Sequence, residues 1–448
     1  MDEQKPIEAL TNLPEDADEP LVSSHFIFPT FLEALGFTNT EILPQYSTGQ
    51  GRQTVDFALR HNHSNDIFIN TKTNPFLLVE LKGRNINLSE GSSQYKTTVN
   101  QLKKYLLDEK CKSAKWGLIT NANHIQLFRK HGKVVHPVTQ VIEITPETIV
   151  NITQSIRQKI AQPKRALTVA VYNNKGGVGK TTTTVNLAAF LASRYKTPEA
   201  NVLVIDLDPD QGDLTKSLGI DQSQGSFYEC LKTKNTDIGN AIQTQQYSLG
   251  NTRKTLTLDV LPIDTQLSPS KLNEDEFRKY VQPHRLKQIL VSLSSKYEYI
   301  FIDTPPNWRS FTALSLYAAD VVLIPTKHNN IHSIENAVTV LNHYIPEVQK
   351  TRKDGLPVPL PIFFNGEKIT DSQRSLITQI IDNIIRNNKP LLPYLYPRFT
   401  PSNKNRHIFE VPVYARIANA AFLKVPAVCQ YKVAYNYYAA LAKEYFIQ

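Results

Sequence analysis

Short apolar runs, separated by polar and turn-forming residues, define a first predicted domain. Strand-length runs rich in Val, Leu, Ile and Phe alternate with stretches whose apolar positions recur at helical spacing. The first helix is expected to end at Gly36, because glycine suits the left-handed conformation that terminates many helices. The predicted elements are a helix at 26–37, strands at 54–61 and 75–83, a helix at 99–110, two strands within 116–135 joined by a turn at 121–123, and a helix at 146–161.

The pattern changes after a predicted boundary at 162–165. Short β-branched strands then alternate with helical stretches, which is the signature of a doubly wound parallel α/β sheet. A helix is predicted over the last stretch, 425–448. The strands are predicted at 167–172, 201–207, 257–263, 297–306, 320–326 and 359–365.

Length and composition describe an ordinary globular protein of two or three domains. The chain has 448 residues, 41% hydrophobic and 20% charged, which excludes a disordered or collagen-like protein. Three distant cysteines, Cys111, Cys230 and Cys429, predict neither a disulfide framework nor a CxxC metal site and favour a reducing compartment. No secretory signal and no bilayer-length apolar run is evident, so we expect a cytoplasmic protein without a membrane role.

The net charge of +9 is concentrated in two segments. Residues 82–133 hold eleven basic and three acidic residues, and residues 386–432 hold eight basic residues and one acid. Residues 1–20 hold seven acids and one lysine, and this segment is expected to be a disordered acidic tail. Most charge runs are simply solvated surface. The alternative is two surfaces that face a polyanion such as DNA, one in each half of the chain.

The strongest motif, NNKGGVGKTT at 173–182, lies between a predicted strand and a predicted helix. Glycines let backbone N–H groups point at a phosphate, and the helix offers its positive end to the anion. Lys180 is expected to reach the β- and γ-phosphates, and Thr181 to ligate Mg²⁺. Asn174 stands where the usual G-x-x-x-x-G-K-[ST] pattern has its first glycine. The alternative to a phosphate-binding loop is a glycine-rich turn that binds nothing. The residues expected to hold the nucleotide are Lys175, Gly176, Gly177, Val178, Gly179, Lys180, Thr181 and Thr182.

Three aspartates, Asp206, Asp208 and Asp303, end apolar strands of the second domain. Ligands of doubly wound sheets bind at the carboxyl ends of the strands. A carboxylate in such a place is costly unless a cation or metal pairs with it. Capping of the following helices is the alternative for Asp206 or Asp208 taken singly.

The loop and these aspartates resemble those of the ParA/MinD-type ATPases, over residues 166–448. The resemblance implies that Lys175 crosses a dimer interface to the nucleotide of the partner, and that Asp208 helps to position the attacking water. It also implies that Asp206 and Asp303 lie near Mg²⁺, and that Asn365 contacts adenine. The family's D-P-Q-G is lengthened here by one residue, Asp210. The expected cofactors are therefore ATP and Mg²⁺, with Lys175, Lys180 and Asp208 as the catalytic residues.

The first domain carries Asp56 on one predicted strand and Glu80 and Lys82 on the next. Two acids from neighbouring strands can hold Mg²⁺, and a lysine two residues after the second acid points to the same face. Such a set can activate water and stabilise charge that develops on a phosphate. Gln101 and Tyr105 share one helical face. The alternative to a metal site is that the acids and the lysine are ordinary polar positions of strands. For Gln101 and Tyr105, the alternative is a helix surface without a function.

In this order, these elements resemble the PD-(D/E)xK nuclease superfamily over residues 21–140. The most similar members are the N-terminal domain of type I restriction enzyme motor subunits and the RecB-like nucleases. The resemblance implies that Asp56 and Glu80 hold Mg²⁺ and that Lys82 and Gln101 take part in catalysis. Residues 141–165 are expected to be a helix and linker. The predicted fold is α/β throughout: a doubly wound parallel-sheet P-loop ATPase domain preceded by a smaller α/β restriction-endonuclease-like domain.

Two functions fit these features. The first is an ATPase that dimerises on ATP, binds DNA non-specifically on the nucleoid, and partitions a plasmid or other cargo with a small adaptor protein that stimulates hydrolysis. The second is an ATP-controlled, Mg²⁺-dependent DNA endonuclease in plasmid maintenance or phage defence. A small-molecule kinase or ligase is disfavoured, because no acceptor-substrate residues are evident.

Overall fold

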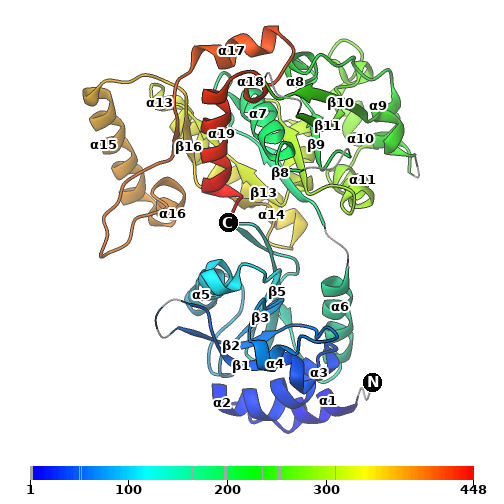
Figure 1. Cartoon of the computed structure of the whole chain (residues 1–448), viewed down its shortest axis with the longest axis vertical. Helices are drawn as coiled ribbons and strands as arrows, with labels where there is room; N and C mark the ends of the chain where they lie inside the picture. The colour runs from blue at the N-terminus through cyan, green and yellow to red at the C-terminus, as the bar shows by residue number, and fades with distance from the viewer. Residues whose placement is uncertain are drawn as a thin grey trace. The chain divides into compact units, whose positions relative to one another are not determined.

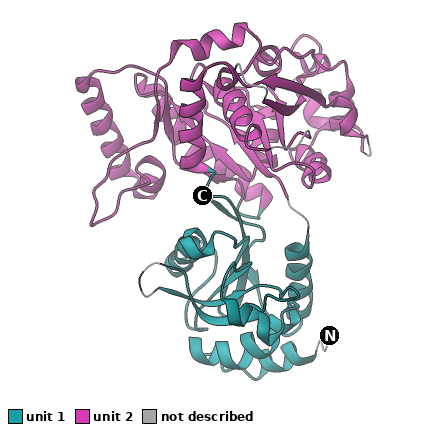
Figure 2. Cartoon of the chain, viewed as in Figure 1, with its two compact units in different colours: residues 1–163, 353–355, 446–448 teal, residues 164–352, 356–445 magenta. Residues whose placement is uncertain are grey.

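The structure, a computed structural model, describes residues 4–49, 51, 53–162, 165–195, 199–234, 236–250, 254–307 and 309–448. It divides into two compact units, which are coloured separately in Figure 2. Unit 1 comprises residues 1–163, 353–355 and 446–448, and unit 2 comprises residues 164–352 and 356–445. The expected boundary at 162–165 falls at this division, although Pro163 and Lys164 lie outside the described residues.

Unit 1 is built on a mixed sheet with strand order β1-β2-β3-β4-β5-β6, and β7 pairs with β5. The first three strands are antiparallel, whereas β3 and β4 are parallel because helix α5 lies between them in the chain. The strands predicted here are confirmed, whereas β1, β6 and β7 were not predicted. In β1, Pro44 and Gln45 interrupt the apolar pattern. The strands are β1 Ile42–Ser47, β2 Thr54–Leu59, β3 Leu77–Leu81, β4 Trp116–Thr120, β5 His124–His131, β6 Val134–Pro137 and β7 Ile142–Glu143.

The segment expected to be a disordered tail is folded onto unit 1 from Gln4 onward. Helix α1 buries Leu10, and Leu13 follows it into the same core as strands β2 and β3. The segment was expected to be disordered because it contains many acidic residues. The apolar side chains between these acids are buried in the core, however, and their burial stabilises the folded segment. The helices of this unit are α1 Gln4–Thr11, α2 Glu19–Val22, η1 Ser23–Phe31, α3 Leu32–Ala34, η2 Asn39–Glu41, α4 Phe68–Thr71, α5 Ser93–Leu107, η3 Glu109–Cys111 and α6 Ile149–Ala161.

Helix α6 confirms the helix predicted at 146–161, and it belongs to the core of unit 1. Ile152 and Ile156 are buried in the same cluster as the strands. The last residues of the chain also belong to this unit: Phe446 is fully buried, and its carbonyl accepts a hydrogen bond from the Lys133 N–H at 3.1 Å. Unit 1 is therefore assembled from both ends of the sequence.

Unit 2 contains a seven-stranded sheet of order β10-β11-β9-β12-β8-β13-β15 (Figure 1). All neighbours are parallel except the edge pair β10 and β11. Helix α7 packs against β8, β9, β11 and β12, whereas α11 and α12 join the apolar cluster that contains Ile205 and Ile302. The predicted doubly wound α/β sheet is confirmed. Its strands are β8 Leu167–Val171, β9 Val202–Asp206, β10 Gln243–Ser248, β11 Thr255–Leu261, β12 Tyr299–Asp303, β13 Val321–Leu323 and β15 Val358–Pro359.

A second, three-stranded parallel sheet was not predicted. It consists of β14 (Pro325–Thr326), β16 (Phe363–Asn365) and β17 (Glu410–Val411). Each of the strands predicted at 320–326 and 359–365 is split between the two sheets, because a proline has no N–H with which to continue a ladder. The helix predicted at 425–448 is likewise two helices, α18 (Ala427–Gln430) and α19 (Lys432–Tyr445), separated at Tyr431.

The remaining elements of unit 2 are helical. They are α7 Lys180–Ala192, α8 Asp213–Ser217, α9 Ser226–Lys232, η4 Ile238–Ala241, η5 Thr265–Leu267, α10 Glu274–Tyr280, α11 Arg285–Leu293, α12 Ser310–Ala318, α13 Ile331–Thr339, η6 Val340–Tyr344, α14 Ile345–Arg352, α15 Asp371–Asn387, η7 Lys389–Leu391, α16 Leu392–Leu395, α17 Ala415–Phe422, α18 Ala427–Gln430 and α19 Lys432–Tyr445. Across the described ranges, no helix has the length and apolar character needed to cross a bilayer.

Candidate functional site

The glycine-rich loop leaves strand β8 and ends where helix α7 begins at Lys180. Gly177 and Gly179 have φ angles of +73° and +86°, a conformation that glycine adopts without strain. A Cβ atom built on Gly176 or Gly177 would meet no atom within 4 Å, so the loop is open on this side. The loop therefore offers backbone N–H groups and free space to an anion.

The two lysines of the loop differ in their surroundings. Lys180 is buried, and its Nζ donates to the Lys175 carbonyl at 3.1 Å. Burial lowers the pKa of Lys180, while the Asp303 and Asp208 carboxylates act in the opposite direction. The Lys175 ammonium is half-buried and has no hydrogen bond or ion pair with the part of the chain that the structure describes. Lys180 is thus held inside the loop, and Lys175 is available to another molecule.

Thr181 and Asp303 contact one another at the carboxyl end of the sheet. The Thr181 hydroxyl donates to Asp303 Oδ2 at 2.6 Å, and within the described ranges Asp303 Oδ1 is buried without a hydrogen-bond partner. Burial and the neighbouring Asp206 raise the pKa of Asp303. A hydroxyl and an unpartnered carboxylate oxygen beside an open phosphate loop fit a hard cation such as Mg²⁺. No cluster of three or more His, Cys, Asp or Glu side chains suited to a metal ion occurs in the described residues.

Asp206 lies opposite Asp303 in the ladder between β9 and β12, so the sheet register places the two carboxylates side by side. Both oxygens of Asp206 are already engaged: Oδ2 accepts from the Thr215 N–H and hydroxyl at 2.9 and 2.6 Å, and Oδ1 accepts from the Asp208 N–H at 3.2 Å. Burial raises the pKa of Asp206 to about 6 despite these bonds. Asp206 therefore positions the segment that follows β9. The sequence did not identify Thr215, which lies in no motif.

Asp208 caps the turn that accommodates the additional residue Asp210. Its Oδ1 accepts from the N–H groups of Asp210 and Gln211 at 3.1 and 3.2 Å, and Gly212 closes the turn with a φ of +57°. Burial raises the pKa of Asp208, and Lys180 lowers it. Asp208 thus caps a turn and not the following helix, whose N-cap is Gly212. The role of Asp208 toward water stays a prediction.

Two asparagines fix the loop from the outside. Asn365 Nδ2 donates to the Val178 carbonyl at 3.0 Å, and a Cβ on Gly179 would lie 2.1 Å from that nitrogen. Asn174, which replaces the usual glycine, accepts from the Tyr172 hydroxyl at 3.2 Å and donates to Asn336 Oδ1 at 3.2 Å. Asn365 thus holds the loop here; its contact with adenine stays a prediction.

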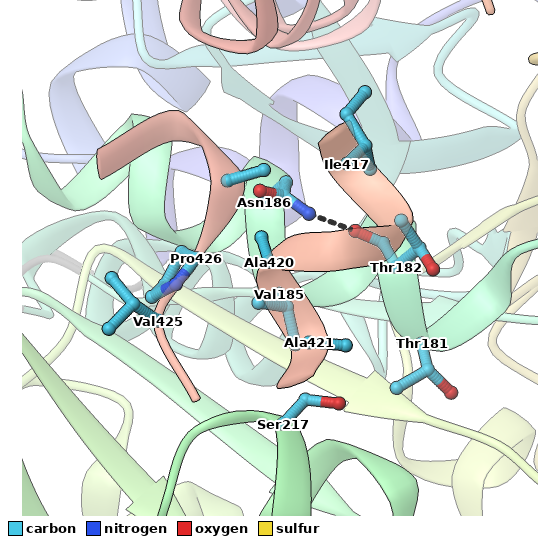
Figure 3. A pocket seen from close by; sticks show the side chains of 11 residues that line it. Thr181, Thr182, Val185, Asn186, Ser217, Ile417, Ala420, Ala421, Val425 and Pro426 are labelled. Carbon is cyan, nitrogen blue, oxygen red and sulfur yellow. Dashed lines mark hydrogen bonds between the residues drawn. The ribbon is translucent and has the colours of Figure 1, made fainter. Parts of the chain in front are cut away.

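A small cavity adjoins the first turns of α7 (Figure 3). Thr181, Thr182 and Val185 of α7 line it together with Ile417 and Ala420 of α17. Its volume is about 30 Å³, which is enough for a water molecule and too small for a nucleotide. A nucleotide is therefore expected on the open glycine side of the loop.

Comparison with known proteins identifies the family. An AAA domain family model matches residues 166–358. The chain is 34% identical over 223 residues to the chromosome partitioning protein ParA of Myxococcus xanthus, across 48% of this chain and 69% of that protein. The chain belongs to the ParA family. The sporulation initiation inhibitor protein Soj of Bacillus subtilis, 34% identical over 220 residues, is matched across 48% of this chain and 78% of that protein.

ParA proteins are P-loop ATPases, so the ATPase character expected for residues 166–448 is confirmed at the level of the family. Among solved structures, a complex of a Cyanothece McdA variant with ATP is similar with a TM-score of 0.47 and 21% identity, covering 64% of this chain and 98% of that one.

Unit 1 also brings together the residues predicted for its own site, namely Asp56, Glu80 and Lys82. Lys82 Nζ donates to Glu80 Oε1 at 2.7 Å, and Asp56 Oδ2 accepts from the Leu81 N–H at 2.7 Å. Glu80 is buried, and in the described part of the chain its Oε2 has no hydrogen-bond partner. Burial and the Asp56 carboxylate raise the pKa of Glu80 to about 7, while Lys82 acts in the opposite direction.

The sequence did not identify a third acid at this site. Glu19 Oε2 lies 3.5 Å from Lys82 Nζ, and burial and Asp56 raise the pKa of Glu19. Glu19 had been assigned to the acidic tail, where one acid among seven gives no signal of its own. Gln101 Nε2 donates to the Tyr105 hydroxyl at 2.9 Å, so these two predicted residues contact one another.

The raised pKa of Glu80 predicts a pH-dependent stability. Between its ordinary pKa of 4.5 and about 7, the folded protein binds a proton that the unfolded chain has lost, so stability falls as pH rises. The difference corresponds to about 3 kcal/mol. Glu80→Gln removes the titrating group. The free energy of unfolding of this variant, relative to that of the wild type, is therefore expected to rise as the pH increases from 4.5 to about 7. Urea unfolding of both proteins at pH 4.5 and 7.5 measures this; equal pH profiles would refute it.

Proposed function

We propose that the protein is a ParA-type ATPase that dimerises on ATP, binds DNA without sequence specificity, and hydrolyses ATP to partition a plasmid, a chromosomal locus or other cargo. One observation carries the proposal: an open glycine loop with a buried Lys180 stands beside a Thr181–Asp303 pair, in which one carboxylate oxygen has no hydrogen-bond partner among the described residues. Partitioning is suggested by the name of the Myxococcus relative.

Within the site, Lys180 and the loop N–H groups would hold the phosphates, and Thr181 and Asp303 would hold Mg²⁺. The bound metal would neutralise phosphate charge and act as a Lewis acid toward the transferred phosphoryl group. Asp208 is positioned by the turn it caps to orient the attacking water. Asp206 would support Asp208, because it accepts hydrogen bonds from the Asp208 N–H and from Thr215 and so fixes the segment between them.

The DNA surface is assigned to the basic segment 386–432. Part of its charge is already neutralised: Arg398 Nη2 donates to both carboxylate oxygens of Glu444 at 2.7 and 2.6 Å, and Arg406 lies 3.3 Å from Asp382. Six exposed cations of the segment make no ion pair with described residues, and phosphate contacts by such groups weaken steeply with salt. They are Arg386, Lys389, Lys404, Arg416, Lys424 and Lys432. Binding to the nucleoid in the cytoplasm and a small adaptor protein that stimulates hydrolysis complete the proposal.

Lys175→Ala tests the dimer. Because the Lys175 ammonium has no partner among the described residues, its removal is expected to leave the fold and ATP binding intact while abolishing ATP-dependent dimers. Light scattering in the presence of Mg²⁺ and ATP measures the molecular mass of the particle. Lys271→Ala, a substitution of an exposed lysine outside the phosphate loop, serves as the control. An unchanged dimer fraction in Lys175→Ala would contradict the role of this lysine.

A second candidate function, DNA cleavage by unit 1, is supported by the buried Glu80 beside Asp56 and Lys82, whose Oε2 accepts no hydrogen bond from any residue that the structure describes. Asp56 and Glu80 would hold Mg²⁺, and Lys82 would stabilise phosphate charge. Gln101 would assist through the helix face that it shares with Tyr105.

Incubation of the purified protein with supercoiled plasmid and Mg²⁺ or Mn²⁺, with and without ATP, tests cleavage. The expected result is nicking by the wild type, at a rate that changes with ATP, and none by Glu80→Ala. Equal nicking by both proteins, or none by the wild type, would leave unit 1 as a DNA-binding module.

A further inference from the structure

The turn that ends helix α17 exposes two large apolar side chains in succession. Phe422 is 87% exposed, more than any other large hydrophobic residue in the described part of the chain, and its neighbour Leu423 is 55% exposed. Single exposed apolar residues are common on protein surfaces, whereas adjacent ones suggest contact with another molecule. The pair is therefore a candidate contact point.

The backbone of this turn is held in one position. The Leu423 N–H donates to the Ala420 carbonyl at 3.0 Å. Lys424 has a φ of +56°, and its Cβ lies 3.1 Å from a Cβ built on Gly219, which follows helix α8. Because these contacts define the turn, its two apolar side chains are presented without the ordering entropy that a mobile loop loses on binding.

The surroundings of the pair are cationic. Arg416 and Lys424 beside it, and Lys432 at the start of α19, are exposed and form no ion pair with described residues. The Arg416 guanidinium lies 5.4 Å from the centre of the Tyr431 ring. The sequence has no acid from residue 411 to residue 443. Such a surface is complementary in charge to a polyanion.

Duplex DNA fits this surface better than an anionic membrane or a second protein. A helix that lies on a membrane turns its apolar face outward, whereas Ile417 and Ala420 of α17 line the cavity beside α7 (Figure 3). A stable protein interface buries roughly 800 Å² on each partner, far more than two side chains supply. Minor-groove binding proteins, in contrast, insert apolar side chains such as Phe and Leu between base pairs and surround them with cations.

We propose that Phe422 and Leu423 form a wedge that inserts between stacked base pairs of duplex DNA. Arg416, Lys424 and Lys432 contact the flanking phosphates. The inference rests on the proposed DNA binding and adds the side chains and the mode of contact. A wedge of this kind depends on how easily a base step unstacks and not on base edges, so it is compatible with binding that lacks sequence specificity.

Helix α17 also connects the wedge to the nucleotide loop. Ile417 and Ala420 line the same cavity as Thr181 and Thr182, which belong to the first turn of α7. Helix α17 packs on α8 as well, the helix that follows the turn capped by Asp208. A change in α7 or α8 on ATP binding would therefore reach the wedge through direct contacts.

The double variant Phe422→Ala/Leu423→Ala tests the wedge, because both side chains are exposed and their loss leaves the core intact. With Mg²⁺ and ATP, it is expected to bind a random-sequence duplex about tenfold more weakly than the wild type, since apolar burial is lost. Its salt dependence should be unchanged, whereas Arg416→Gln should reduce the slope of log affinity against log salt by about one. Val291→Ala, at a 61% exposed apolar position of α11, is the control and should change neither quantity.

Bending of the DNA gives an independent readout. Energy transfer between dyes at the two ends of the duplex should rise when the wild-type protein binds, because an inserted wedge kinks DNA by about 20–90°. At saturating protein, the double variant should leave the duplex straight. Wild-type affinity and bending in the double variant would overturn the wedge and leave the proposed DNA binding intact. No ATP-dependent DNA binding by the wild type would overturn the proposed function and the wedge together.

Two further measurements separate DNA from other partners of the same surface. The wild type is expected not to co-sediment with vesicles of phosphatidylcholine and phosphatidylserine. Co-sedimentation that the double variant loses would assign Phe422 and Leu423 to a membrane and overturn the proposal. Loss of the ATP-dependent dimer in the double variant, measured by light scattering, would assign them to a contact between two copies of the chain and overturn it as well.

Discussion

Lys180→Ala is expected to abolish ATP binding. Lys180 is the buried cation of the loop, and charge-assisted hydrogen bonds from its ammonium to phosphate oxygens have no substitute there. Loss of two or more such bonds corresponds to an affinity lower by about 100-fold or more. A thermal-shift titration with Mg²⁺ and ATP measures this, since a ligand that binds only the folded state raises the midpoint of unfolding.

The same variant has a second expected signature. Burial of the Lys180 ammonium is unfavourable without an anion, so Lys180→Ala should be at least as stable as wild type when no nucleotide is present. A loss of stability in the absence of nucleotide would mean that the lysine mainly supports the fold. Nucleotide-dependent stabilisation equal to that of the wild type would contradict its assignment to the phosphates.

Asp208 variants are expected to bind ATP but to hydrolyse it slowly. Residues that orient or deprotonate an attacking water typically contribute about 10²- to 10⁴-fold to the rate. If the dimer binds DNA until hydrolysis, Asp208→Ala should accumulate on DNA with ATP bound. Steady-state phosphate release and retention on DNA in the presence of ATP measure the two effects.

Asp208→Asn separates catalysis from capping. Asparagine keeps an oxygen that can accept from the Asp210 and Gln211 N–H groups, but it lacks the carboxylate charge. Both Asp208→Asn and Asp208→Ala are therefore expected to lose hydrolysis, whereas only the alanine variant should lose stability, by about 1 kcal/mol. Normal hydrolysis by Asp208→Asn would show that the residue serves only the turn.

Some parts of this site could be read from the sequence because they depend on local order along the chain. The strand, glycine loop and helix around Lys180 are contiguous, and strands that end in aspartate must bring Asp206 and Asp303 to one edge of a parallel sheet. The register of β9 and β12 then makes these two carboxylates neighbours. The sequence also predicted the strands that carry Asp56 and Glu80.

The remaining features depend on contacts between distant segments, for which the sequence offers no local signal. Thr215 lies nine residues beyond Asp206 and is brought back to it by the turn at Gly212. Glu19 reaches Lys82 only because apolar residues order the acidic N-terminal segment. The split of two predicted strands between two sheets follows from where Pro325 and its neighbours interrupt the ladder.

The central claim is that ATP controls DNA binding, and an equilibrium titration of a labelled random-sequence duplex, followed by fluorescence anisotropy, tests it most directly. With Mg²⁺ and ATP, the wild-type protein is expected to bind at least about tenfold more tightly than with ADP or without nucleotide, and the ATP-dependent gain should be absent in Lys175→Ala. Affinity should fall linearly with the logarithm of salt concentration, as phosphate neutralisation requires. Equal DNA affinity in all nucleotide states, or no binding to the duplex in any of them, would contradict the account.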